Sequence, residues 1–215
     1  MKFTLTFDGE LPASGNKAKP EAKWAIRNQI HPQLAELWQT QPMLKALRAN
    51  AVVPTGNQWV SQKFQYDTDR FGGLPSGSPM TDTQIDTCAP MVFGDKAYTP
   101  LIRSSLHLSC ELEILFLRKE EPGATLLQAG ELDNRLKTLF DGLRLPEPDE
   151  LKAGSPVESP LCCLMESDTL IDAVHVRTGQ LLTRPGGSIR EVRAVIEVKV
   201  KVLKFRPYNA MLLGD

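Results

Sequence analysis

Residues 130–144 bring acidic, amide and basic side chains together at helical spacing. The segment reads GELDNRLKTLFDGLR. At about 100° per residue, Asp133, Lys137, Asp141 and Arg144 share one polar face, beside an apolar face of leucine and phenylalanine. A carboxylate and an ammonium four residues apart usually form a surface ion pair worth about 0.2–0.5 kcal/mol. The same groups can instead bind a divalent cation and a phosphate. The spacing alone favours the ion pair and leaves both interpretations open.

A second acidic group follows at Glu166 and Asp168, immediately before the sequence TLI at 169–171. Carboxylates at the start of a strand and at the start of a helix can share one site. Mg²⁺ prefers such oxygen ligands and keeps several waters beside them. The simpler alternative is a solvated acidic turn. Residues 141–172 contain eight acidic and two basic residues, so the general acidity of this stretch also accounts for the pattern.

Together, the two acidic groups resemble those of the RusA-type Holliday junction resolvases. That family carries the pattern acid-x-Asp-Asn-x-x-Lys on a helix and a further acid at the next strand. The present chain has ELDNRLKTLFDGLRLP and later ESDTLI. The resemblance matches Glu131 and Asp133 to the two helix acids and Lys137 to the lysine. It matches Asp168 to the downstream acid, with Glu166 as a competing metal ligand.

This resemblance implies a mixed α/β nuclease that uses Mg²⁺, or Mn²⁺ in its place, to cut branched DNA. It implies that Glu131, Asp133 and Asp168 hold the metal against the scissile phosphate. Lys137 would neutralise the charge that builds up on the phosphorus, and Asn134 would contact the nucleic acid. Family members are usually homodimers, which places two sites on the two strands of a symmetric junction.

Two features separate the chain from the small phage-type members of that family. Glu131 stands where an aspartate is more usual. The segment 145–165, rich in Pro, Glu and Ser, is longer than a minimal member needs and is predicted to be a loop insertion. Both features favour an alternative, in which the chain is a non-catalytic DNA-binding or assembly protein that retains the fold.

A group of basic residues follows the predicted N-terminal turn. It comprises Lys17, Lys19, Lys23 and Arg27. Such a group is most often a solvated helix face, and the functional alternative is phosphate contact at the rim of the metal site. The tryptophans at 24, 38 and 59 could likewise stack on bases, although core packing is their more common role.

The surrounding sequence predicts the elements that must position these groups. Apolar residues alternate with polar residues in some segments and recur at helical spacing in others. The predicted strands are 2–8, 104–118, 169–178 and 190–205, and the predicted helices are 20–50, broken near Pro32, and 131–144. The resulting order, β–α–β–α–β–β, is typical of one α/β or α+β domain over 1–215, with a mixed sheet packed by helices.

Composition limits the class of protein. With 41% apolar and 24% charged residues, the chain can bury a core, and it has no apolar run near the roughly 20 residues that span a bilayer. No signal-peptide pattern begins the chain, and the four cysteines lack metal-ligand spacing. We therefore expect a cytoplasmic protein with reduced thiols and no membrane partner. The net charge of −1 argues against DNA binding through overall charge alone.

Overall fold

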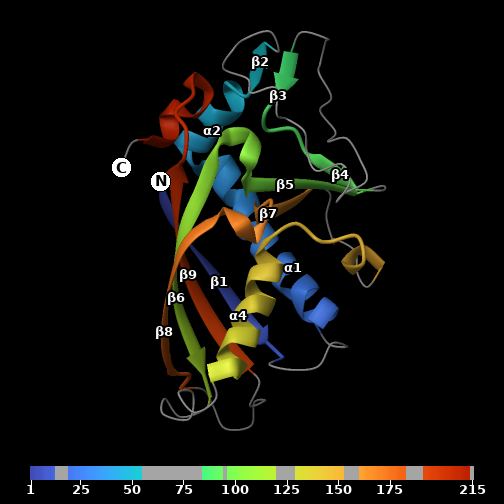
Figure 1. Cartoon of the computed structure of the whole chain (residues 1–215), viewed down its shortest axis with the longest axis vertical. Coiled ribbons are helices and arrows are strands. Elements are labelled where there is room, and N and C mark those ends of the chain that lie inside the picture. Colours follow the sequence, from blue (N-terminus) through green and yellow to red (C-terminus); the bar gives the residue numbers. More distant parts are fainter. Residues whose placement is uncertain are drawn as a thin grey trace.

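The computed structural model describes residues 1–12, 19–54, 84–93, 96–119, 129–152, 160–182 and 191–213. A four-stranded sheet with two long helices on one face forms its main body (Figure 1). The strands are β1 (Lys2–Glu10), β2 (Val52–Pro54), β3 (Gln84–Asp86), β4 (Met91–Phe93), β5 (Lys96–Ile102), β6 (Leu108–Arg118), β7 (Leu161–Met165), β8 (Ile171–Gln180) and β9 (Glu191–Val202). The α-helices are α1 (Lys19–Thr40), α2 (Pro42–Ala49) and α4 (Ala129–Leu143), and the short 3₁₀ segments are η1 (Ser104–Leu106), η3 (Glu150–Lys152), η4 (Asp168–Leu170) and η5 (Pro207–Leu213).

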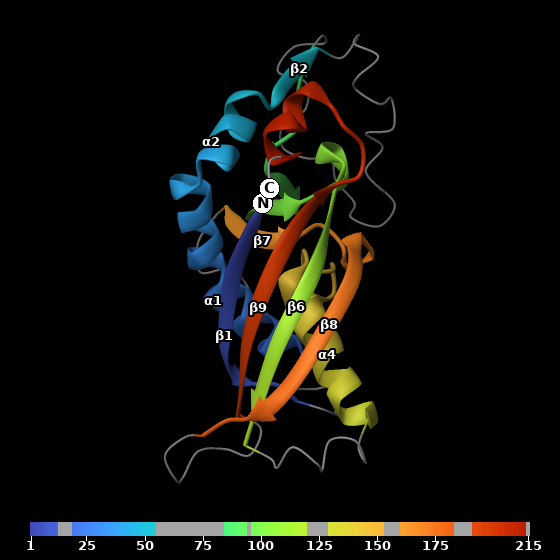
Figure 2. The same ribbon diagram turned by 90° about the vertical axis from the view of Figure 1, so that its left-hand side faces the viewer.

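The large sheet has the strand order β1-β9-β6-β8, in which β6 and β8 run parallel and the other pairs run antiparallel. Parallel neighbours need a crossover connection, and α4 lies in the one between β6 and β8 (Figure 2). In β9, alternate residues from Val192 to Val200 are buried on the face that the helices cover. The elements around this sheet follow the predicted order β–α–β–α–β–β, so the predicted mixed α+β class is confirmed.

The first helix continues through Pro32, where the sequence predicted a break. Pro32 is exposed on the outer side of α1, where a backbone carbonyl that loses its N–H partner can turn to solvent. The break falls at Gln41 instead. Gln41 is extended (φ −75°, ψ 118°), as a residue before proline prefers, and Pro42 begins α2, where no backbone N–H is needed.

The predicted loop insertion at 145–165 contains regular structure, which corrects that prediction. Its last residues form β7, which pairs in parallel with β5, while β5 pairs with β4, so that a second, three-stranded sheet forms. The sequence LCCLM of β7 is a short apolar run without alternation, and the strand packs against α1. The same segment contains η3, and its residues 153–159 lie outside the described part of the chain.

Within the described residues, no helix is long and apolar enough to cross a membrane. All four cysteines are free thiols. Burial raises the pKa of Cys110 and of Cys163 to about 12, so both of these thiols stay protonated at neutral pH.

Candidate functional site

The apolar face of α4 determines where its polar side chains lie. The residues of this face that are buried in or packed against the core are Leu132, Leu136, Leu139, Phe140 and Leu143. Gly142 allows α1 to come close, because a Cβ at this position would lie 2.6 Å from the Cδ1 atom of Ile26. With this face held against the sheet and α1, Arg135 and Thr138 are also buried, and the other described polar residues of α4 are half-buried or exposed.

The first half of α4, taken as its residues up to Lys137, exposes Asp133 and Lys137 to solvent, whereas Arg135 is buried. Asp133 and Lys137 are both exposed, and neither forms an ion pair with any described residue. The ion pair that their spacing favours is therefore not formed. Asn134 is half-buried, and its carbonyl oxygen accepts a hydrogen bond from Thr138 Oγ1 at 3.0 Å. Glu131 lies in the first turn of α4, and its side chain is outside the described residues.

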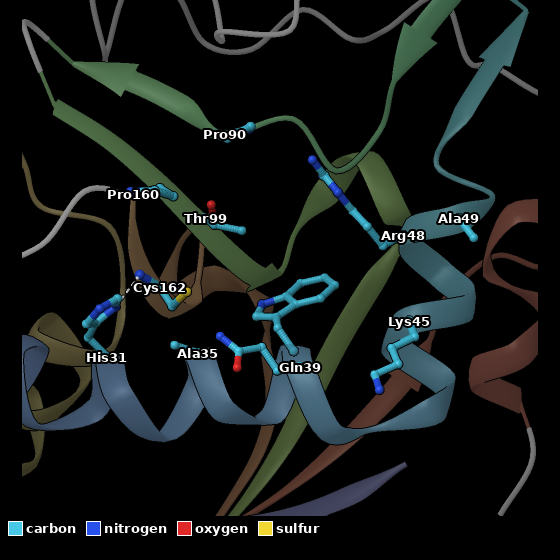
Figure 3. A pocket seen from close by; sticks show the side chains of 11 residues that line it. His31, Ala35, Gln39, Lys45, Arg48, Ala49, Pro90, Thr99, Pro160 and Cys162 are labelled. Carbon is cyan, nitrogen blue, oxygen red and sulfur yellow. Dashed lines mark hydrogen bonds between the residues drawn. The ribbon is translucent and has the colours of Figure 1, made fainter.

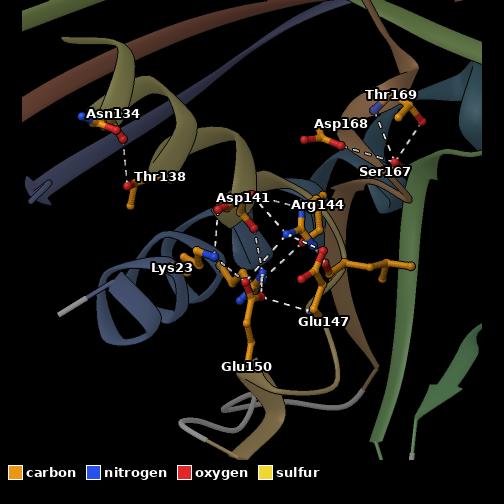
Figure 4. A network of polar contacts seen from close by, with 12 residues as sticks. Lys23, Asn134, Thr138, Asp141, Arg144, Glu147, Glu150, Ser167, Asp168 and Thr169 are labelled. Atoms are coloured by element: carbon orange, nitrogen blue, oxygen red, sulfur yellow. Dashed lines mark hydrogen bonds and ion pairs between the residues drawn. The ribbon is translucent and has the colours of Figure 1, made fainter. Parts of the chain in front are cut away.

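The second half of α4 places its charges in a buried network with α1 and the segment after α4 (Figure 4). The buried network comprises Lys23, Arg27, Asp141, Arg144, Glu147 and Glu150. Asp141 Oδ2 lies 2.8 Å from Lys23 Nζ, and Asp141 Oδ1 lies 3.1 Å from Arg144 Nη2. Glu150 binds two cations of α1, at 2.5 Å from Lys23 Nζ and at 2.6 Å from Arg27 Nη2.

The contacts of the buried network shift two pKa values in the directions that keep both groups charged. Burial alone lowers the pKa of Lys23, but hydrogen bonds to Asp141 and Glu150 outweigh burial and raise the pKa above its usual 10.5. Burial alone raises the pKa of Asp141, but Lys23 and Arg144 outweigh burial and hold the pKa below its usual 3.8. Three basic and three acidic side chains thus compensate one another where burial would otherwise penalise each charge.

Two of the predicted phosphate contacts belong to this network instead, which corrects their assignment. Arg27 is 2% exposed, and its guanidinium binds Glu150 and two backbone carbonyls. Lys23 lies between two carboxylates, with 13% of its side chain exposed. Neither charge is left for a phosphate. Lys17 lies outside the described residues, and Lys19 begins α1 with a side chain that is also outside them.

The downstream acidic group lies beside the end of α4. The backbone N–H of Leu145 donates to the carbonyl of Met165 at 3.1 Å, which holds the two segments together. Glu166 is half-buried, and its Oε2 accepts the backbone N–H of Ser104 at 2.8 Å. Asp168 is exposed in η4. Glu166 therefore supports the local backbone, while Asp168 is open to solvent.

The predicted metal ligands whose side chains the structure describes do not converge within one chain. Asp133 stands in the second turn of α4, and the helix continues to Leu143, about 15 Å farther along its axis. Figure 4 shows Asn134, the neighbour of Asp133, and Asp168 on opposite sides of the view, with the end of the helix between them. No group of three His, Cys, Asp or Glu side chains within the described ranges could hold a metal ion.

Two features escaped sequence reasoning. The first is the pairing role of Glu150, which looks like one more acid in an acidic stretch. The second is a pocket of about 680 Å³ between α1, α2 and the three-stranded sheet, with Lys45 and Arg48 in its lining. These two residues have ordinary helix-surface spacing, so no sequence signal distinguishes them.

Comparison with protein-family models, with curated proteins and with solved structures finds no match to this chain. The resemblance to RusA-type resolvases therefore rests on the motif residues themselves, and the function that they imply is a proposal.

Proposed function

We propose that the chain is a Mg²⁺-dependent endonuclease that cuts branched or structured DNA, such as a Holliday junction, and that it works in the cytoplasm as a homodimer. The observation that carries this proposal is that two charged side chains in the first half of α4 are exposed and unpaired among the described residues. Asp133 and Lys137 are exposed and form no ion pair with the described residues, whereas Asp141 and Arg144 farther along are paired. A carboxylate and an ammonium at the spacing of the resolvase motif are thus available to a metal ion and a phosphate.

The fit of these residues to Mg²⁺, or to Mn²⁺ in its place, depends on a second copy of the chain. Asp133 and Asp168 are hard oxygen ligands of the kind that Mg²⁺ prefers, but in one chain Asp133 stands near the start of α4 and Asp168 lies in the segment beside its end. In a twofold dimer, the first half of α4 in one protomer can meet η4 of its partner, and the symmetry then creates two such sites. Two sites are what a symmetric junction needs for two cuts.

Each residue of this site has a separate task. Mg²⁺, when bound, lowers the pKa of a coordinated water and stabilises the leaving oxygen. Asp133 and Asp168, with Glu131 two positions before Asp133 in the sequence, would hold the ion against the scissile phosphate. Lys137 stands one helical turn from Asp133 and neutralises negative charge that grows on the phosphate in the transition state.

Cleavage of a four-way DNA junction tests the proposal. Asp133→Asn nearly preserves the shape of the side chain but removes its charge, so cleavage should fall on the order of a hundredfold or more. The matched control is Asp149→Asn, the same change at an exposed acid outside the proposed site, which should leave cleavage unchanged. Equal cleavage by the wild-type protein and Asp133→Asn would exclude Asp133 as a metal ligand.

A second candidate function is a DNA-binding or assembly protein without catalysis. The separation of Asp133 from Asp168 within one chain favours it, because a monomer then has no group of three such side chains among its described residues that could hold a metal ion. This alternative predicts that the protein shifts a junction in a gel but does not cut it in Mg²⁺ or Mn²⁺. The nuclease proposal predicts binding in Ca²⁺ and cutting when Mg²⁺ replaces it.

A further inference from the structure

The pocket between α1, α2 and the three-stranded sheet has the size of a ligand site. Its volume of about 680 Å³ falls in the range of about 300–1,000 Å³ for small-molecule pockets. Figure 3 shows its labelled lining residues on α1, α2, β5 and the segments that lead into β4 and β7. The pocket is separate from the proposed cleavage site, since Asp133, Lys137 and Asp168 do not line it.

Rigid apolar groups form much of the pocket wall. Trp38 contributes a large aromatic ring from α1, and the small side chain of Ala35 lies one turn earlier on the same helix. Pro90 and Pro160 lie across the pocket from α1 (Figure 3). A flat ring system placed between these walls loses apolar surface on both of its faces. Nucleic-acid bases meet this requirement, and they stack on tryptophan whatever their sequence.

The end of the pocket at α2 carries positive charge. Lys45 and Arg48 both line it, and Lys45 is exposed without an ion pair to any described residue. Arg48 Nη1 donates to the carbonyl of Cys88 at 2.7 Å and lies 3.6 Å from Asp86 Oδ2, and its guanidinium has further N–H groups to offer. In Figure 3 the Lys45 and Arg48 side chains point away from each other, and Arg48 already faces Asp86. Lys45 is therefore the cation that is left for a phosphate group.

The other polar groups of the pocket offer hydrogen bonds without charge. Gln39 and Thr99 line the pocket and carry an amide and a hydroxyl, each of which can donate and accept. His31 is already engaged, because its Nδ1 accepts the backbone N–H of Cys162 at 2.9 Å. An uncharged heterocycle with donors and acceptors along its edge matches this set of groups.

We infer that this pocket binds a nucleotide, with the base against Trp38 and the phosphate at Lys45. The bound nucleotide could be a free mononucleotide or one nucleotide unit of single-stranded DNA. The inference stands apart from the proposed nuclease activity, because the pocket uses other residues and its binding is measured without a divalent metal.

Isothermal titration of the full chain in EDTA tests the inference with thymidine 5′-monophosphate, thymidine, inorganic phosphate and a short thymidine oligonucleotide. The monophosphate should bind at least about tenfold more tightly than thymidine or phosphate alone, since it uses both ends of the pocket. Lys45→Gln should weaken its binding about fivefold to tenfold, and Trp38→Leu about tenfold or more. The matched control Lys2→Gln, at an exposed lysine on β1, should leave binding unchanged.

Thermal unfolding accompanies each variant, because Trp38 also packs against the main core. Lys45 is exposed, so Lys45→Gln decides the question where Trp38→Leu fails to fold. Tighter binding of the oligonucleotide than of the mononucleotide assigns the pocket to single-stranded DNA, and the opposite order assigns it to free nucleotides. Absence of binding, or equal binding of the monophosphate to the wild-type protein and Lys45→Gln, overturns the inference.

Discussion

The two halves of α4 carry similar charged residues in different surroundings. In the second half, Asp141 and Arg144 pack toward α1 and the segment after α4, where Asp141 is half-buried, Arg144 is buried and both are paired. In the first half, Asp133 and Lys137 stand at a similar spacing but meet solvent, and they form no ion pair with the described residues. The two halves of α4 thus share residue types and spacing. The neighbouring elements decide which charged side chains are paired within the fold and which remain available to a ligand.

The difference between the two halves indicates which charged residues of this fold could contact a ligand. α1 approaches α4 closely at Gly142, and it brings Lys23 and Arg27 to the carboxylates of that end. Cations that are satisfied in this way stabilise the protein and cannot contact DNA. We therefore propose the first half of α4, and not the second, as the place of the chemistry.

The largest expected effect is on the stability of the protein, when the buried network at the second half of α4 is disrupted. Glu150→Ala removes the carboxylate that binds Lys23 and Arg27. Lys23 keeps its ion pair with Asp141, but the buried Arg27 is left without a carboxylate partner among the described residues. We expect the free energy of unfolding to fall by about 3–5 kcal/mol. Asp133→Ala, on the exposed half, should change it by no more than about 0.5 kcal/mol. Urea unfolding of both variants measures the two changes in the free energy of unfolding. Equal losses in the two variants would contradict this prediction.

The next largest expected effect is on the rate of junction cleavage, when Lys137 in the first half of α4 is changed. Lys137→Ala should slow single-turnover junction cleavage on the order of a hundredfold, equivalent to about 3 kcal/mol, with little change in stability. Lys137→Arg should restore only part of the rate, because a planar guanidinium does not replace a compact ammonium.

A gel-shift titration in Ca²⁺ separates catalysis from binding for the same variant. Junction binding should weaken far less than cleavage, because many phosphate contacts share that task. An equal loss in both assays would make Lys137 a binding residue. Lys2→Ala, at an exposed lysine outside the site, provides the control.

A smaller effect concerns the pH dependence of the buried network. The pKa of Asp141 is lowered in the folded protein, so its contribution to stability is complete above about pH 3.8 and is lost as the pH falls through the folded value. Asp141→Asn should be less stable than the wild-type protein at neutral pH, by on the order of 1 kcal/mol, and the gap should narrow in acid. Unfolding curves of both proteins at several pH values between about 7 and 2.5 measure this difference in stability. A gap that stays constant would show that Asp141 is not stabilised through its charge.

The smallest effect is the response of thermal stability to Mg²⁺. A cation that binds the folded dimer raises its melting temperature, and a gain of 1 kcal/mol corresponds to about 2–4 °C for a chain of this size. Asp133→Asn and Asp168→Asn should each reduce the shift, whereas Asp149→Asn should retain it. A shift that survives both of the first two changes would place the cation elsewhere.

The large sheet and α4 were predictable because their signals are local. Alternation in 190–205 and helical spacing in 131–144 reflect which side of each element is buried. The buried network was not predictable, because Glu150 pairs with residues 123 and 127 positions away. The separation of Asp133 from Asp168 was foreseeable, since the predicted helix places one acid near its start and the other beyond its end.

The most direct test of the account is complementation between two inactive variants. Asp133→Asn and Asp168→Asn, unfolded together and refolded, should form mixed dimers in which one of the two shared sites keeps both wild-type carboxylates. We predict that each variant alone is inactive in Mg²⁺, and that the mixture recovers about a quarter of the wild-type nicking rate, as random pairing requires. A mixture as inactive as its parts, beside an active wild-type protein, would contradict the shared site, and an inactive wild-type protein would contradict the nuclease.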